Sequence, residues 1–135
     1  MKLEVGRYEG YGSFARREFM PAIEEKEIRD QVRGWLQKTW DPNLSLLEWR
    51  EYLVGQRWAV PSWPSDWFGR DYPVWGDEIV RSEILAAGAV ATPVGAGMNL
   101  AAPTILKHGG DEQKNRFLRS ALIGQETWCQ LFSEP

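Results

Sequence analysis

The chain has 135 residues, of which 16 are Lys or Arg and 19 are Asp or Glu, giving a formal net charge of −3. This length predicts one domain, and the acidic balance argues against a nucleic-acid-binding protein, which normally carries a basic face. A single cysteine and a single histidine exclude an internal disulfide framework and a metal centre built from several Cys or His ligands.

Residues 1–20 show no sustained hydrophobic period, and we interpret them as an irregular N-terminal arm. The arm has no apolar stretch of the kind that a signal peptide requires, so the sequence predicts a cytoplasmic protein. The uncharged stretch 84–106 is interrupted by Pro93 and Pro103. It is therefore expected to form short buried helices rather than a membrane span.

An amphipathic helix of about five turns is predicted to begin at Pro21 and to end before Asp41. Its apolar residues recur at every fourth position and define one buried face, while charged residues fill the other face. The apolar residues of that face are Ile28, Val32, Leu36 and Trp40.

A second helix is predicted after Ser45, because Ser45 and Glu48 have the spacing of a capping box, and it should stop near Gly55. We expect this helix to turn Leu46, Trp49, Tyr52 and Leu53 toward the core. The following stretch 58–70 contains two prolines and four aromatic residues, so it should be an ordered loop packed on the core.

A third helix is expected from about Val74 to Gly88, with its apolar residues facing inward. Pro93 and Pro103 should each start a further short helix, and Gly109–Gly110 should form a left-handed stop. The last helix should be capped by Asp111, run to Ile123 and end at Gly124. The residues expected to be buried in the third and last helices are Trp75, Ile79, Val80, Ile84, Ala87, Phe117, Leu118, Ala121 and Leu122.

Residues 127–133 have the β-branched and aromatic content of a strand, within which Cys129 should be a small buried residue. A lone strand needs a partner for its backbone groups, so we expect this one to belong to a missing β-domain. The sequence thus predicts an all-α domain of five or six helices over residues 21–125, followed by the first strand of a truncated β-domain over residues 126–135.

The end of this chain, Cys129-Gln130-Leu131-Phe132-Ser133-Glu134-Pro135, resembles the flavin signature of the acyl-CoA dehydrogenase family, of which it holds the front half. Taken alone, Ser133-Glu134-Pro135 is also compatible with a simple strand-ending turn. Three upstream stretches resemble the same family in the same order, so the resemblance extends over about residues 22 to 135. They are the Leu-rich second helix, the Trp63-Pro64…Phe68-Gly69-Arg70 connection, and the stretch Leu100–Lys114.

This resemblance implies the N-terminal helical part of an FAD-dependent enzyme that converts an acyl-CoA thioester to its 2-enoyl form, passing a hydride to flavin N5. It implies a flavin-contact segment in which Gln130, Leu131, Phe132 and Ser133 take part, with Phe132 against the ring system and Ser133 near N5 and O4. The catalytic base of the family is a glutamate far downstream, so no catalytic residue is expected in this chain and the isolated chain should be inactive.

In the resembled family the helix corresponding to 93–101 walls the acyl-chain tunnel. The small residues of this stretch suggest a long, branched or ring-bearing acyl group, with Thr92, Gly95, Met98 and Asn99 nearest to it. The same small residues would equally allow close packing between helices.

The resemblance also implies an electron-transfer flavoprotein or a similar acceptor as partner, a homo- or hetero-oligomeric assembly, and a place in fatty-acid or other lipid metabolism. Two alternatives stay open at this stage. One is an acyl-CoA oxidase or flavin monooxygenase on the same scaffold, and the other is a non-catalytic helical interaction subunit.

Overall fold

The structure is a computed structural model that describes residues 23–131, and every regular element in this range is helical. The prediction of an all-α domain is therefore confirmed, whereas the expected arm over 1–20 lies outside the described residues. The first helix begins at Glu25, with Glu24 as its extended N-cap, rather than at Pro21. The elements are α1 (Glu25–Thr39), α2 (Leu46–Gly55), the 3₁₀ turn η1 (Ser65–Trp67), α3 (Trp75–Ala86), the π turn η2 (Gly97–Ala101), α4 (Ala102–His108) and α5 (Asp111–Ile123).

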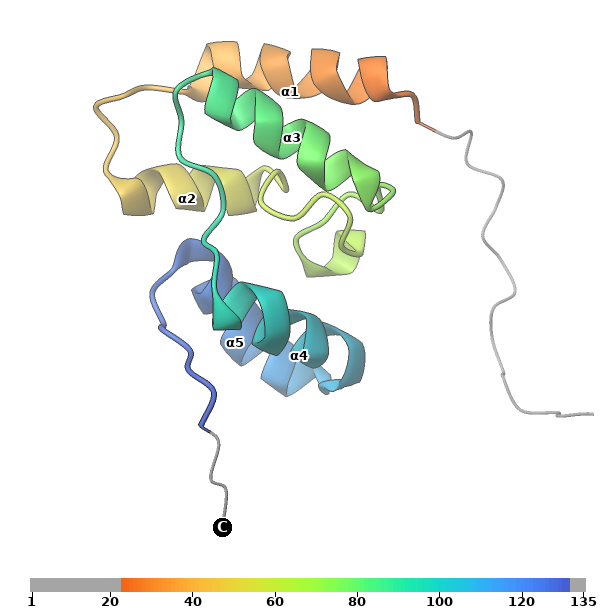
Figure 1. Cartoon of the computed structure of the whole chain (residues 1–135), viewed down its shortest axis with the longest axis vertical. Helices are drawn as coiled ribbons and strands as arrows, with labels where there is room; N and C mark the ends of the chain where they lie inside the picture. The colour runs from red at the N-terminus through yellow and green to blue at the C-terminus, as the bar shows by residue number, and fades with distance from the viewer. Residues whose placement is uncertain (1–22, 132–135) are drawn as a thin grey trace, which may run out of the picture.

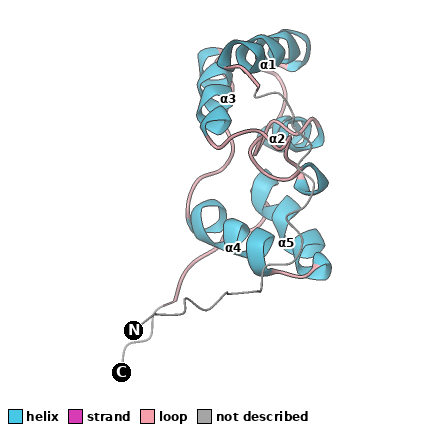
Figure 2. Ribbon diagram, turned by 90° about the vertical axis from the view of Figure 1, so that its right-hand side faces the viewer, coloured by secondary structure: helices cyan, strands magenta, loops and turns pink. Residues whose placement is uncertain are grey.

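The helices form two packed groups joined by α2 (Figures 1 and 2). Helix α1 lies along α3 at one end of the molecule, and α4 lies beside α5 at the other. Helix α2 lies between the groups and contacts α5. The segment between α3 and η2 runs down the side of the molecule from one group to the other.

The apolar residues at every fourth position of α1 form a buried face, as predicted. Ile28, Val32 and Leu36 are all buried. They belong to a main core cluster to which α1, α2, α3, the end of α5 and two loops contribute. A small cluster of Ala102, Leu118 and Ala121 fills the second group. Trp63, Phe68 and Met98 pack against both clusters, so the two groups share side chains at their boundary.

Helix α3 turns a different face inward from the one expected. Ile79, Val80 and Ile84 are buried as predicted, but Trp75 is 47% exposed and Ala87 lies on the surface. The carboxylate of Glu83 takes the remaining buried position, because Arg29 and Arg33 of α1 neutralise it across the α1–α3 contact. A buried acid is tolerated only with such partners.

Helix α2 has the predicted capping box: the Ser45 side chain accepts from the Glu48 backbone N–H, and the Glu48 carboxylate accepts from the Ser45 backbone N–H. Its predicted inward face is partly wrong, because Leu46 and Tyr52 are each 47% exposed while Val54 is buried. Val54 extends the buried face around one side of the helix and leaves Tyr52 on the other side, and Leu46 stands at the helix end, where the core stops.

The aromatic loop 58–70 is packed as predicted. Trp58 is buried, and the Arg70 guanidinium stacks on its ring at 3.5 Å while donating to the carbonyls of Gln56 and Arg57. Gly69 lies so close to the Trp63 carbonyl that a Cβ at this position would overlap it. The loop is therefore held by ring packing and by hydrogen bonds to its own backbone.

Pro103 lies in the first turn of α4, as predicted, whereas no helix begins at Pro93. The π turn η2 precedes α4, and the two form one continuous helical stretch from Ala96. Pro103 has no N–H and cannot close an α-helical bond to Asn99. The backbone accommodates it with a π turn, in which the Ala102 N–H reaches the Gly97 carbonyl five residues back. This turn places η2 and α4 end to end.

Two smaller expectations about the last helix need correction. Gly109 and Gly110 have negative φ, so they form no left-handed stop, and the helix N-cap is Gly110 rather than Asp111. Gly124 does end the helix in the left-handed conformation, with φ of 73°.

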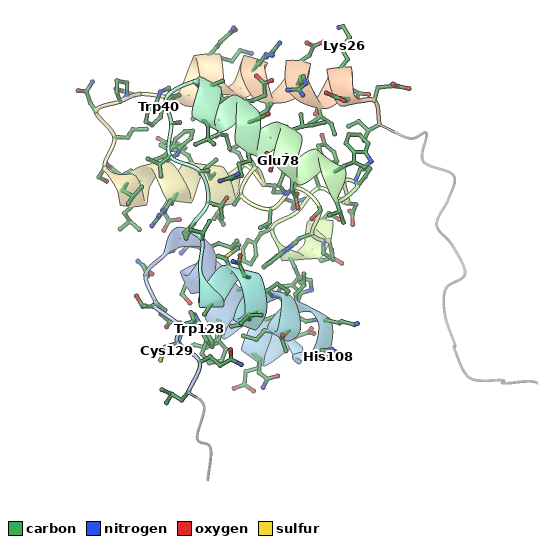
Figure 3. The ribbon with its side chains drawn as sticks, viewed as in Figure 1. Lys26, Trp40, Glu78, His108, Trp128 and Cys129 are labelled. Atoms are coloured by element: carbon green, nitrogen blue, oxygen red, sulfur yellow. The ribbon has the colours of Figure 1, made fainter. Side chains whose placement is uncertain are left out.

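Residues 127–131 form no strand, in contrast to the prediction. Their backbone groups make no backbone hydrogen bond to any other residue between 23 and 131, and a strand requires such a partner. Cys129 is exposed rather than buried, because the segment leads away from the helices at this point (Figure 3).

Candidate functional site

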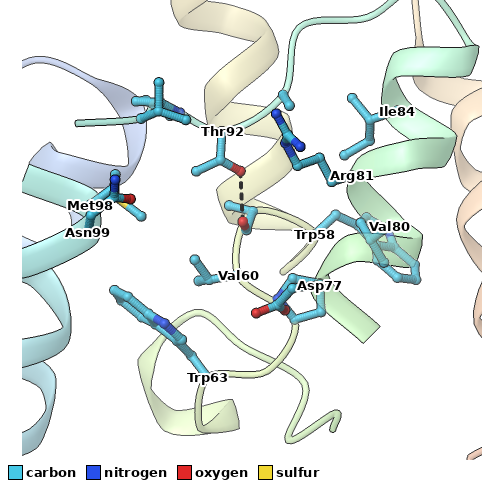
Figure 4. Close-up of a pocket in the computed structure, with 15 residues that line it drawn as sticks. Trp58, Val60, Trp63, Asp77, Val80, Arg81, Ile84, Thr92, Met98 and Asn99 are labelled. Carbon is cyan, nitrogen blue, oxygen red and sulfur yellow. Dashed lines mark hydrogen bonds between the residues drawn. The ribbon is translucent and has the colours of Figure 1, made fainter. Parts of the chain in front are cut away.

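A cavity of about 230 Å³ lies where the aromatic loop, α3, the segment 91–94 and η2 meet (Figure 4). Most of its wall is apolar, because the loop and α3 turn core side chains toward it. The residues that line it are Trp58, Ala59, Val60, Pro61, Trp63, Asp77, Val80, Arg81, Ile84, Ala91, Thr92, Pro93, Val94, Met98 and Asn99.

Three of the four residues singled out from the sequence for substrate contact, Thr92, Met98 and Asn99, line this cavity. The Thr92 hydroxyl donates to the Ala59 carbonyl at 2.7 Å, which fixes the side chain against the loop. Gly95 is not among the lining residues. It has a φ of 119°, and a Cβ built on it would meet open space, so its glycine serves the turn before η2.

Two charged residues of α3 reach the cavity and were missed from the sequence. The carboxylate of Asp77 is bound to the aromatic loop, because it accepts hydrogen bonds from the Ser62 backbone N–H at 2.7 Å and from the Ser62 hydroxyl at 2.5 Å. Arg81 has a half-exposed side chain at the wall, and its guanidinium is 3.8 Å from the Glu78 carboxylate. Arg81 thus offers a cation beside an apolar cavity. No local pattern distinguishes it from an ordinary surface arginine.

A second hollow of about 310 Å³ lies on the other side of η2, against the segment 128–130. Gln130, predicted to contact flavin, lines it together with Trp128 and Cys129, and Figure 3 shows these last two beneath the helices. Leu131 is 89% exposed. Phe132 and Ser133 lie outside the described residues. The helical wall of this hollow consists of Ala96, Leu100, Ala101, Thr104 and Ile105.

The helical stretch that begins at Ala96 turns different faces to the two hollows. Ala96, Leu100 and Ala101 are four or five residues apart and share the face toward the second hollow, whereas Met98 and Asn99 face the first. One turn of backbone therefore separates the two candidate binding regions.

Between residues 23 and 131 no group of three or more His, Cys, Asp or Glu side chains could hold a metal ion. No helix in the same range is long and apolar enough to cross a membrane.

Comparison with known sequences gives a consistent result. A family model described as "Acyl-CoA dehydrogenase, N-terminal domain" matches residues 22–125. The acyl-CoA dehydrogenase FadE34 of Mycobacterium tuberculosis is 40% identical over 76 residues, which is 56% of this chain and 10% of that protein. The acyl-CoA dehydrogenase IpdE1 of Mycolicibacterium smegmatis is 28% identical over 130 residues, which is 84% of this chain and 33% of that protein.

IpdE1 of Mycobacterium tuberculosis is 27% identical over 127 residues. The chain thus spans about a tenth to a third of the length of the curated relatives that it matches. No solved structure matches it significantly.

Proposed function

Because the chain belongs to the acyl-CoA dehydrogenase family, we propose that it is the N-terminal helical part of an FAD-dependent enzyme that dehydrogenates an acyl-CoA thioester to the 2-enoyl-CoA. The observation that carries this proposal is the family match over the whole helical region, together with a C-terminal segment that lies open beside a helical wall. The catalytic base would come from outside these residues, so the isolated chain should be inactive.

The residues present fit one edge of a flavin ring. A planar aromatic ring needs an apolar wall and N–H donors at its polar edge. The second hollow combines Leu100, Ala101 and Ile105 with the backbone of 128–130, which makes no backbone hydrogen bond within residues 23–131. In such enzymes FAD accepts the hydride from the substrate. We propose that Gln130, Leu131, Phe132 and Ser133 supply backbone and hydroxyl donors that stabilise negative charge on that edge.

The first hollow is proposed to contribute to the acyl-chain site. Thr92, Met98 and Asn99 line it, and the cavity beside them has a volume of about 230 Å³. This arrangement favours a long, branched or ring-bearing acyl group. Gly95, expected to join them, instead shapes the turn that leads into η2.

An oligomeric assembly and an electron acceptor such as an electron-transfer flavoprotein are part of the same proposal. A cytoplasmic location is proposed as well. The alternatives on the same scaffold, an acyl-CoA oxidase or a flavin monooxygenase, differ in how the reduced flavin reacts with oxygen. A non-catalytic interaction subunit differs in binding no flavin.

The test is to express the polypeptide encoded by the reading frame extended beyond Pro135 and to record its absorbance. We expect a yellow protein whose flavin band is bleached by acyl-CoA without oxygen and is not rapidly restored by air. Rapid reoxidation by air would identify an oxidase or monooxygenase instead. A colourless protein would contradict the proposal and favour the interaction subunit.

A further inference from the structure

Trp128 occupies a notch between two helices at the point where the chain leaves the helical domain. Its ring packs edge-to-face against Phe117 of α5, with ring centroids 5.5 Å apart, and on its other side it meets the backbone of Gly97 in η2. A Cβ on Gly97 would lie 2.8 Å from Trp128 Cδ1, closer than real Cβ contacts allow. The notch therefore exists because residue 97 has no side chain.

The turn that leads to Trp128 is also fixed. Gly124 turns the chain in the left-handed conformation, and the Glu126 carboxylate then accepts from Arg116 at 2.6 Å and from the Ser120 hydroxyl at 3.0 Å. These contacts hold residues 124–126 on α5. Beyond Trp128 the structure gives no comparable anchor among the described residues, since Cys129, Gln130 and Leu131 are exposed.

Packing rather than hydrogen bonding holds the indole. Its Nε1 is shielded from solvent and has no acceptor among residues 23–131. A position held only by ring contacts depends on the shape of the notch, because close-packed side chains tolerate little change in volume. Gly97 and Phe117 therefore decide where the indole, and with it the backbone of residue 128, can lie.

We infer that Trp128 is the positioning residue that fixes the direction in which the flavin-contact segment leaves the helical domain, by locking into the notch between Gly97 and Phe117. This inference rests on the proposed function for the importance of that segment. It goes beyond it in assigning a role to the Trp128 side chain and to Gly97 and Phe117, which line neither hollow. Gly97 also belongs to the turn whose other face lines the first hollow, so the same contact sets the spacing between the two proposed binding regions.

The exposed Cys129 offers a direct test, because it is the one cysteine in the sequence and it follows Trp128. A nitroxide spin label on Cys129 reports the mobility of the segment by electron paramagnetic resonance. Gly97→Ala acts on Trp128 from 31 positions away, so it changes nothing in the chain beside the label. Gly34→Ala is the matched control, since Gly34 is also a helical glycine with negative φ and a Cβ there meets nothing within 4 Å.

We expect Gly97→Ala to shorten the rotational correlation time of the label several-fold while the helical circular dichroism is kept, and Gly34→Ala to leave the label unchanged. Phe117→Leu removes the other wall and should give the same mobility gain, which keeps the inference testable if Gly97→Ala does not fold. An unchanged label in both notch variants, or an equal gain in Gly34→Ala, would overturn the inference.

The extended yellow protein separates this inference from the proposed function. There Gly97→Ala should weaken flavin retention several-fold relative to Gly34→Ala. If the wild-type extended protein bound no flavin, the proposed function would be contradicted. The mobility of the spin label on Cys129 would still test the role of Trp128. Flavin retention equal in the two variants would overturn the positioning role even if wild type is yellow.

Discussion

Arg33 of α1 binds the buried carboxylate of Glu83 on α3 with two hydrogen bonds, Nε to Oε2 at 2.6 Å and Nη2 to Oε1 at 2.9 Å. Arg29 adds a third donor, Nη1 to Oε1 at 2.7 Å. The three donors converge on a side chain that is 7% exposed, whereas the two arginines keep part of their surface in water. This cluster sets how α1 lies on α3.

Replacing the acid tests the strength of this contact. Glu83→Ala should lower the free energy of unfolding by about 1–3 kcal/mol, because it removes the acceptor of a buried, charge-assisted set of hydrogen bonds. Urea denaturation measures the change. Asp30→Ala is the control, since Asp30 pairs with Lys26 on the fully solvated side of α1 and should matter little. Equal effects from the two substitutions would show that the α1–α3 cluster carries no special stability.

The same carboxyl should make stability depend on acid pH. The hydrogen bond from Arg33, reinforced by Arg29, holds the pKa of Glu83 below its ordinary value of 4.5, although burial acts in the opposite direction. Because the unfolded chain binds a proton at higher pH than the folded one, this contribution is complete above about pH 4.5 and is lost as the pH falls through the lower folded pKa.

Melting temperatures recorded from pH 7 to pH 3 check this dependence. Three other carboxyl groups have a lowered pKa in the folded chain, so the protein as a whole should lose stability in acid. They are Asp30 beside Lys26, Glu48 beside Ser45 and Glu126 beside Arg116. Glu83→Gln should be less stable at neutral pH and lose less on acidification than wild type. Parallel pH curves for the two proteins would contradict the assignment to Glu83.

Gly69 and Gly34 should respond in opposite ways to the addition of one methyl group. Gly69→Ala forces a Cβ into the Trp63 carbonyl and should destabilise the protein by about 1–3 kcal/mol or more, as overpacking does. Gly34→Ala meets nothing and should stabilise α1 by about 0.5–1 kcal/mol through higher helix propensity. Thermal melts of the two variants, recorded side by side, measure both effects. If both variants were stabilised, the close approach of Gly69 to the Trp63 carbonyl would be disproved.

Narrowing the first hollow should change the preference for acyl groups. Asn99 is exposed and lines the cavity, so Asn99→Phe should reduce kcat/KM about tenfold for a ring-bearing acyl-CoA while leaving a short acyl-CoA nearly unaffected. Kinetics of the extended, flavin-loaded protein measure both. Asn115→Phe, on the exposed surface of α5, controls for the added ring. A uniform loss for both substrates would argue that the cavity does not receive the acyl chain.

Local patterns predicted the elements of this fold well where one interaction determines the outcome. The period of four in α1 buried Ile28, Val32 and Leu36, because the helix has one neighbour-facing side, and the capping box before α2 formed as its spacing indicates. The family resemblance rested on motifs of this local kind and was confirmed by the family match.

Other features depend on what packs against each residue. From the sequence alone, Glu83 is an ordinary surface acid, because only the fold brings the arginines of α1 to it. Leu46 is predicted to be buried, but it lies at the end of α2, beyond the helices that would cover it. Pro103 marks the first turn of α4 as predicted, whereas the π turn before it has no local signature in the sequence. In the candidate site, Thr92, Met98 and Asn99 line one cavity, and their contact with substrate stays a prediction, whereas Arg81 gave no signal in the sequence.

The π turn of η2 has a consequence for how this protein can diverge. Met98 and Asn99 on one side and Leu100 and Ala101 on the other are carried by the same five-residue π turn. This turn is the wall between the two hollows. A bulkier residue that reshapes one hollow therefore shifts the wall and changes the volume of the other. Adaptation of either hollow to a new ligand therefore requires compensating substitutions on the opposite face of the turn. The residues that line the two hollows should consequently vary together among relatives.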